Sequence, residues 1–150
     1  MKKEKHTFQP IGLGLITVDP ELAKNFKKIK RLKEVTTSAL RDAPGKIRKK
    51  PVFIELVDEK IEDYTNRRKS AVAQSEVLES GLFIRLAEEH HSGKGGYSET
   101  LDSIVHEIIE CSMVVERELR NKSPRSNKEF NADEKVVVGR TDKKLRSLKR

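Results

Sequence analysis

The chain has 150 residues, of which 35% are hydrophobic, 37% are charged and 5% are aromatic. This length allows one domain with extensions or two very small domains, and this composition supports only a modest hydrophobic core. A single cysteine excludes a disulfide within the chain, and the apolar run at residues 11–18 is far shorter than the roughly 20 residues that span a bilayer. We therefore expect a cytoplasmic protein with no membrane partner.

The formal net charge of +8 is unevenly distributed along the chain. Residues 1–50 carry 14 Lys/Arg against 5 Asp/Glu, residues 51–121 carry 8 against 15, and residues 122–150 carry 10 against 4. Two basic arms therefore flank an acidic middle. Basic arms are attracted to phosphate backbones, which favours a nucleic-acid partner. The alternative is that the arms are solvated tails.

Residues 1–47 are expected to form a basic extension that contains a short helix. The β-branched, apolar residues 11–18 favour a strand or an extended segment. Asp19-Pro20-Glu21 combines an N-cap acid, a proline at the first helical position and an acid in the first turn, which predicts a helix to about Leu32. A second short helix is predicted at residues 35–42, and it ends at the Ala-Pro-Gly that follows.

Residues 48–89 show a specific order of elements. Pro51-Val-Phe-Ile-Glu-Leu56 is short, β-rich and led by proline, which is typical of an edge strand or a two-stranded ribbon. An acid-capped helix is predicted at about 58–68, and after a basic turn a second helix is predicted from about Ala71 to Glu89.

This order resembles the ribbon-helix-helix family of DNA-binding proteins. The resemblance implies a mostly α fold in which two chains each give one strand to an antiparallel ribbon, above a core of four helices. The ribbon would enter the major groove, which is wide enough to admit it. Members with long extensions are similar to plasmid partition adaptors and relaxosome accessory proteins, and shorter members are transcriptional repressors and antitoxins.

The resemblance also implies a set of DNA contacts. The ribbon would point Phe53 and Glu55 outward toward the bases, although Arg, Lys, Gln, Asn or Thr is usual at such positions. The other expected contacts are to phosphates, from the residues before the strand and near the start of the second helix: Arg48, Lys49, Lys50, Arg67, Arg68, Lys69, Gln74 and Ser75. The alternative is that the basic residues bind phosphates and the ribbon contributes little to base reading.

A third helix is predicted at residues 97–121. Its apolar side chains follow a three-four spacing, from Leu101 and Ile104 to Cys111 and Leu119. This stripe either packs on the predicted core or contacts another protein. Residues 122–150 are expected to form a basic, disordered tail.

No metal site, cofactor site or catalytic group is expected. His90-His91 lacks further ligands nearby in the sequence, and His106 stands on the third helix. The acids of that helix are expected to form a solvated face: Glu107, Glu110, Glu116 and Glu118.

Together these features predict a non-enzymatic DNA-binding protein. We expect an accessory factor of plasmid or mobile-element transfer or maintenance that binds double-stranded DNA as a homodimer. Its protein partner would be a relaxase, a partition motor or a toxin. The alternatives are a repressor or antitoxin of the ribbon-helix-helix type, and a helical adaptor whose basic arms bind an acidic protein.

Overall fold

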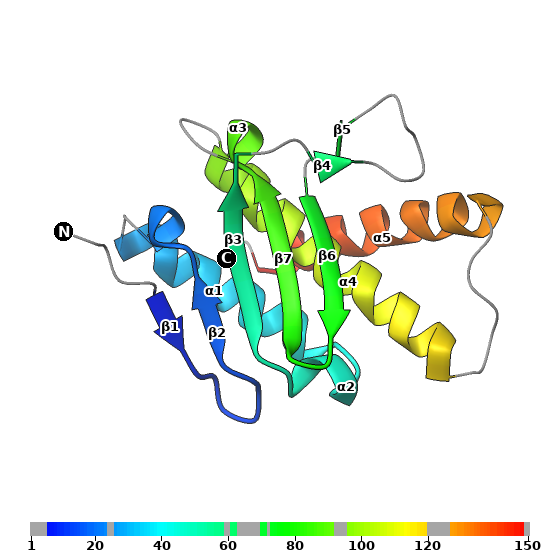
Figure 1. Cartoon of the computed structure of the whole chain (residues 1–150), viewed down its shortest axis with the longest axis horizontal. Helices are drawn as coiled ribbons and strands as arrows, with labels where there is room; N and C mark the ends of the chain where they lie inside the picture. Colours follow the sequence, from blue (N-terminus) through cyan, green and yellow to red (C-terminus); the bar gives the residue numbers. More distant parts are fainter. Residues whose placement is uncertain are drawn as a thin grey trace.

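Five strands form one mixed sheet in the computed structural model, in the order β1-β2-β3-β7-β6 (Figure 1). The structure describes residues 6–23, 26–58, 61–62, 70–71, 73–91, 96–119 and 127–148. The strands of this sheet are β1 (His6–Phe8), β2 (Ile16–Val18), β3 (Val52–Val57), β6 (Ala73–Leu78) and β7 (Gly81–Ala87). A separate two-stranded sheet consists of β4 (Ile61–Glu62) and β5 (Ser70–Ala71).

Helices connect the strands and cover one face of the sheet (Figure 1). The connection from β2 to β3 contains η1 (Pro20–Ala23), α1 (Phe26–Arg41) and α2 (Gly45–Arg48). After β7 come α3 (Glu88–His91), α4 (Gly96–Leu119) and α5 (Asn127–Ser147). Parallel strands need a long crossover rather than a tight turn, and the passage through α1 allows β2 and β3 to pair in parallel.

Alternate residues of the strands build the core. Their side chains point toward α1 and α4, and each is at most 1% exposed: Ile16, Val18, Val52, Ile54, Leu82, Ile84 and Leu86. Burial of one such side chain stabilises the fold by about 1.5–3 kcal/mol relative to exposure. The period of two in these strands therefore specifies which face of the sheet is covered.

The predicted ribbon-helix-helix fold is wrong, because β3 lies in the middle of the sheet. A strand was correctly predicted at residues 51–56, but β3 pairs in parallel with β2 on one side and with β7 on the other. A ribbon strand would leave an edge for a second chain, whereas both edges of β3 are hydrogen-bonded within its own chain. The fold is α/β with a sizeable mixed sheet, not mostly α.

The second predicted helix, at about 71–89, is also wrong: it is a hairpin followed by the short helix α3. Strands β6 and β7 pair antiparallel, and two residues separate the facing positions Leu78 and Gly81. Leu78, Leu82 and Leu86 lie at helical spacing, but the buried residues Leu82, Ile84 and Leu86 have the period of two that is typical of a strand. Gly81 also permits a close approach, because an added Cβ would lie 2.7 Å from the Pro51 carbonyl oxygen.

The first predicted helix, at about 58–68, contains β4 at residues 61–62. Residues 59–60 and 63–69 lie outside the described residues. Nearer the N-terminus, the strand expected at 11–18 is confirmed at residues 16–18. The two helices expected at 20–32 and 35–42 are instead η1 and one continuous α1. The buried residues Leu32, Val35 and Ala39 extend one apolar face through α1.

The predicted third helix is confirmed as α4, which packs on β6, β7 and α1. Its stripe from Ile104 to Val115 is buried, whereas Leu119 at the end is 64% exposed. The stripe therefore serves the core of this chain, which was one of the two readings of the sequence. None of the described helices is both long and apolar enough to cross a membrane.

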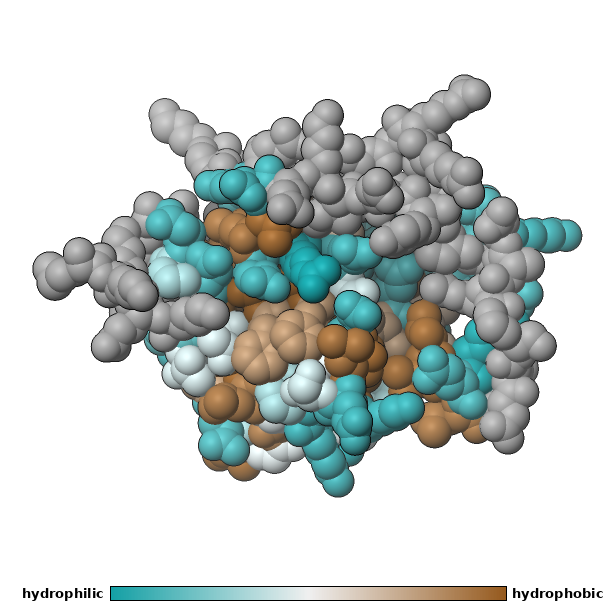
Figure 2. Space-filling view, viewed as in Figure 1, coloured by the Kyte–Doolittle hydropathy of each residue, from teal (hydrophilic) through white to brown (hydrophobic). Residues whose placement is uncertain are grey.

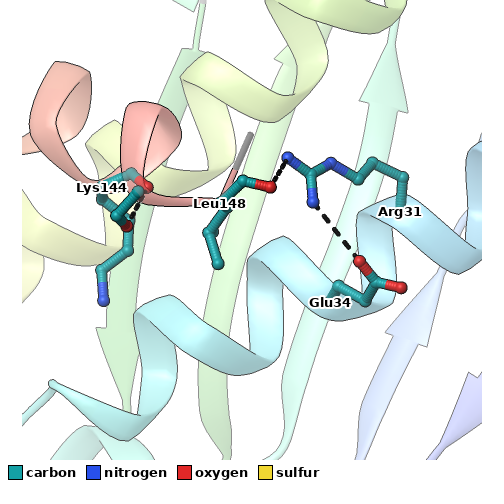
Figure 3. Close-up of polar contacts among 5 residues, drawn as sticks. Arg31, Glu34, Lys144 and Leu148 are labelled. Atoms are coloured by element: carbon teal, nitrogen blue, oxygen red, sulfur yellow. Dashed lines mark hydrogen bonds and ion pairs between the residues drawn. The ribbon is translucent and has the colours of Figure 1, made fainter. Parts of the chain in front are cut away.

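Residues 127–147 form the helix α5, where a disordered tail was predicted. The helix packs along α4, and Val137 is fully buried. Its last turns lie against α1, where the Arg31 guanidinium donates a hydrogen bond to the Leu148 carbonyl oxygen at 2.5 Å (Figure 3). Lys144 contacts Ser38 and Asp42 near the other end of α1. The buried face of α5 is small and interrupted by Thr141, so its helical period is weak in the sequence.

The other face of the sheet is not covered by α1 or α4. Phe53 and Phe83 stack on it with ring centroids 4.9 Å apart, and Glu55 pairs with Arg85 at 3.7 Å. Figure 2 looks onto this face and shows hydrophobic residues near its centre and toward its lower margin, with hydrophilic residues interspersed among them. The face is amphipathic rather than strongly charged.

Candidate metal centre

One histidine and two glutamates meet between α4 and α5. His106 and Glu110 lie one turn apart on α4, and Glu134 lies on the facing side of α5. The His106 Nε2 atom lies 2.9 Å from Glu134 Oε1 and 3.9 Å from Glu110 Oε2. The three side chains are 24%, 18% and 38% exposed in the order His106, Glu110, Glu134. They are therefore half-buried but open to solvent on one side.

These separations fit a divalent cation. Imidazole nitrogen and carboxylate oxygen bind Zn²⁺ at 2.0–2.2 Å in tetrahedral geometry, which places neighbouring ligand atoms about 3.4 Å apart. The three ligand atoms here all lie within 4.8 Å of one another, so small side-chain rotations would bring them to that spacing. Three protein ligands leave a fourth position for water or substrate, as catalytic zinc sites require. Within the part of the chain that the structure describes, this is the only such cluster found.

Glu107 lies beside this cluster and is almost fully buried, with 5% of its surface exposed. Ser75 on β6 donates a hydrogen bond to Glu107 Oε2 at 3.4 Å and accepts one from the Cys111 thiol at 3.0 Å. Burial and the neighbouring Glu110 carboxylate together raise the pKa of the Glu107 carboxyl to about 8, although the charge of His106 acts in the opposite direction. The site thus holds a carboxyl group that binds its proton unusually tightly.

The pKa of His106 is also raised, by a balance of opposing effects. Burial alone would lower it, but the hydrogen bond and the charge of Glu134, with the nearby charges of Glu107 and Glu110, outweigh burial. A protonated His106 imidazole neutralises part of the charge of the carboxylates around it. A bound metal ion would provide the same neutralisation.

The spacing of these residues was visible in the sequence. His106-Glu107-x-x-Glu110 has the arrangement of the helical motif His-Glu-x-x-His, in which the first and last residues bind Zn²⁺ and the glutamate acts as a general base. Here Glu110 replaces the second histidine. The helix acids were expected to form a solvated face, an expectation that fails for the buried Glu107. No pattern in the sequence indicated Glu134 as a ligand, because its segment was expected to be disordered.

The predicted DNA contacts lie in several places. Phe53, Glu55 and Gln74 share the uncovered face of the sheet. Ser75 follows Gln74 on β6 and therefore points the opposite way, toward α4. Because residues 73–78 form a strand, Gln74 and Ser75 do not lie at the helix start from which they were predicted to contact a phosphate.

The predicted basic contacts are only partly described. Lys49 is exposed at the end of α2, Arg48 is half-buried beside it, and Lys50 donates a hydrogen bond to the Glu79 carbonyl oxygen at 3.2 Å. Arg67, Arg68 and Lys69 lie outside the described residues. The seven predicted contacts that lie within the described residues are therefore not assembled on one surface.

His91, the second residue of the histidine pair at 90–91, has a structural role. His91 is buried, with Nδ1 2.7 Å from the Ala87 carbonyl oxygen and Nε2 2.8 Å from Ser103 Oγ. The Thr100 hydroxyl donates to the His91 carbonyl oxygen. These bonds fasten α3 to α4 and use both ring nitrogens of His91, so this side chain is not positioned as a metal ligand.

The assignment of this centre depends on its geometry alone. Comparisons with protein-family models, with curated proteins and with solved structures found no match to this chain.

Proposed function

We propose that the chain is a metal-dependent hydrolase whose centre consists of His106, Glu110 and Glu134, with Glu107 as the general base. The observation that carries this proposal is the convergence of three ligand atoms from two helices beside a buried carboxylate. A bound divalent ion would polarise a carbonyl oxygen and acidify a water molecule. The charge of a bound ion would favour the ionised form of the Glu107 carboxyl, which could then accept the proton of the attacking water and pass it to the leaving group.

An extended polypeptide is the substrate class that fits the surroundings best. β6 is the last strand of the sheet, and Ser75 on this strand contacts Glu107. The outer edge of such a strand offers backbone N–H and C=O groups with which an extended peptide can pair. Pairing there would hold a peptide bond alongside the helix that carries the centre.

Metal binding is the first test. We expect metal-free full-length protein to bind one Zn²⁺ ion in isothermal titration calorimetry. His106→Ala and Glu134→Ala should each weaken binding more than about tenfold, because each removes one of three protein ligands. Glu118→Ala is the matched control, since this exposed acid lies on the same helix outside the cluster. Absence of binding by both Zn²⁺ and Mn²⁺ would refute the metal centre.

Hydrolysis is the second test, with an unfolded protein such as reduced casein as the probe. Glu107→Gln should keep Zn²⁺ affinity near that of the parent, because Glu107 is not a ligand. The same change should lower kcat/KM by at least about 100-fold, because it removes the general base. If the parent protein binds Zn²⁺ tightly but does not hydrolyse casein, the chain is a metal-binding protein and the proposed hydrolase activity is rejected.

A further inference from the structure

The candidate centre is divided between two helices, α4 and α5. α4 supplies His106 and Glu110, and it is fixed to the sheet by its buried apolar stripe. α5 supplies Glu134, and of its three consecutive valines only Val137 is buried. Val136 and Val138 are 42% and 46% exposed. Leu145 and Leu148 are half-buried against the core, so the apolar contacts of α5 include these two side chains as well as Val137.

Other features of α5 oppose docking. Thr141 is 1% exposed, and its hydroxyl has no hydrogen-bond partner among the described residues. A buried hydroxyl without a partner destabilises the state that buries it. The Glu134 carboxylate lies within 4.8 Å of the Glu110 carboxylate, and the His106 imidazole, 2.9 Å from Glu134, offsets part of their mutual repulsion.

Apart from the contact between His106 and Glu134, the polar contacts that hold α5 lie mostly at the surface. Arg31 binds the Leu148 carbonyl oxygen, and Lys144 pairs with Asp42, whose side chain is 67% exposed (Figure 3 shows the Arg31 contact). Near the start of α5, Glu129 pairs with Arg117 at 2.6 Å. Solvent-exposed ion pairs contribute little stability individually. The docked position of α5 therefore rests on several small contributions of comparable size.

We propose that metal binding and the docking of α5 are coupled, so that the metal ion holds the C-terminal helix in place. This inference rests on the proposed metal centre and adds its regulation. A divalent cation held by His106, Glu110 and Glu134 would neutralise both carboxylates and join α5 to α4. Conversely, when only a fraction of molecules has α5 docked, the observed Kd is the intrinsic Kd divided by that fraction. Any residue that stabilises docked α5, even one far from the metal ligands, would then change the observed Kd for the metal ion.

Hydrogen exchange of the full-length chain, measured by mass spectrometry, tests the first half of this proposal. Zn²⁺ should slow exchange of peptides within residues 127–148 by at least about fivefold, a typical coupling between linked sites. Peptides from β3 and β7 should change little. Glu134→Ala should abolish the slowing, because the ion then lacks its ligand on α5.

Remote variants test the second half by Zn²⁺ titration. Arg31→Ala removes the contact with Leu148 and should weaken Zn²⁺ binding by about threefold. Glu34→Ala is the control, because it removes the other partner of Arg31 at 3.3 Å and leaves the Leu148 contact. Thr141→Val should instead tighten binding, since it removes the buried hydroxyl at nearly constant shape. None of these residues belongs to the metal cluster.

The outcomes separate the two proposals. Zn²⁺ binding with equal exchange of residues 127–148 in the presence and absence of metal overturns the coupling and leaves the centre standing. Equal affinity for Zn²⁺ in Arg31→Ala, Thr141→Val and the parent also overturns the coupling. A chain that binds no metal ion at all rejects the centre itself, and the coupling falls with it.

Discussion

Gly14 lies where the chain enters β2, close to the end of α2. Its backbone N–H donates a hydrogen bond to the Arg48 carbonyl oxygen at 3.0 Å. A Cβ atom at this position would lie 2.0 Å from the Lys50 carbonyl oxygen, which belongs to backbone and cannot rotate away. The glycine is therefore required by the close approach of two chain segments.

Gly14→Ala should destabilise the protein by about 2–3 kcal/mol, because the backbone must move to relieve the clash. Urea unfolding followed by circular dichroism measures the change. Gly139→Ala is the opposite control: this glycine lies within α5 with no atom near its missing Cβ, so alanine should stabilise the helix by up to about 1 kcal/mol. Equal midpoints for Gly14→Ala and the parent would contradict the packing described here.

Individual site residues differ in how far the sequence could predict them. His106, Glu107 and Glu110 are neighbours on one helix, and that helix was predicted, so their spacing was sufficient to propose a metal-binding pair. Glu134 is 24 residues beyond Glu110 on a polar segment. Its place in the site depends on the docking of α5, a tertiary contact that local spacing cannot reveal.

At the scale of elements, the strand β3 shows what local pattern can and cannot determine. The alternation of Val52 and Ile54 with Phe53 predicts a strand with one buried face. That alternation is the same for an edge ribbon and for a central parallel strand. The choice depends on pairing with residues 16–18 and 82–87, which are distant in the sequence. The prediction therefore placed the strand correctly and assigned it the wrong neighbours.

The hairpin β6–β7 can be tested by substituting adjacent residues. Ile84 is fully buried beneath the sheet, and Arg85 is exposed on the other face. Ile84→Ala should destabilise the fold by about 2–5 kcal/mol through the lost burial and the cavity. Arg85→Ala should change stability by less than about 1 kcal/mol, because its ion pair with Glu55 is exposed. Similar losses for both variants in thermal unfolding would be inconsistent with a strand at this position.

At the scale of the whole molecule, the net charge of +8 still favours an anionic partner, although the ribbon that would have read bases is absent. Several described cations are engaged by acids: Lys46 with Glu118, Arg85 with Glu55, Arg117 with Glu129, and Lys144 with Asp42. Such pairing reduces the positive electrostatic potential near the described surface. The remaining electrostatic attraction between the chain and an anionic partner is long-ranged, and it does not distinguish one base sequence from another.

DNA binding should accordingly be weak and independent of sequence, with Kd in the range of about 10⁻⁶ to 10⁻⁴ M at physiological salt. Fluorescence anisotropy with two unrelated duplexes should give equal affinities that fall steeply as salt rises, since binding releases counterions. Replacing Arg48, Lys49 and Lys50 with alanine should lower both the affinity and the salt slope. Phe53→Ala should change neither, because its ring lies against Phe83 on the sheet. Nanomolar binding to one duplex that is lost in Phe53→Ala would instead identify the uncovered sheet face as a base-reading surface.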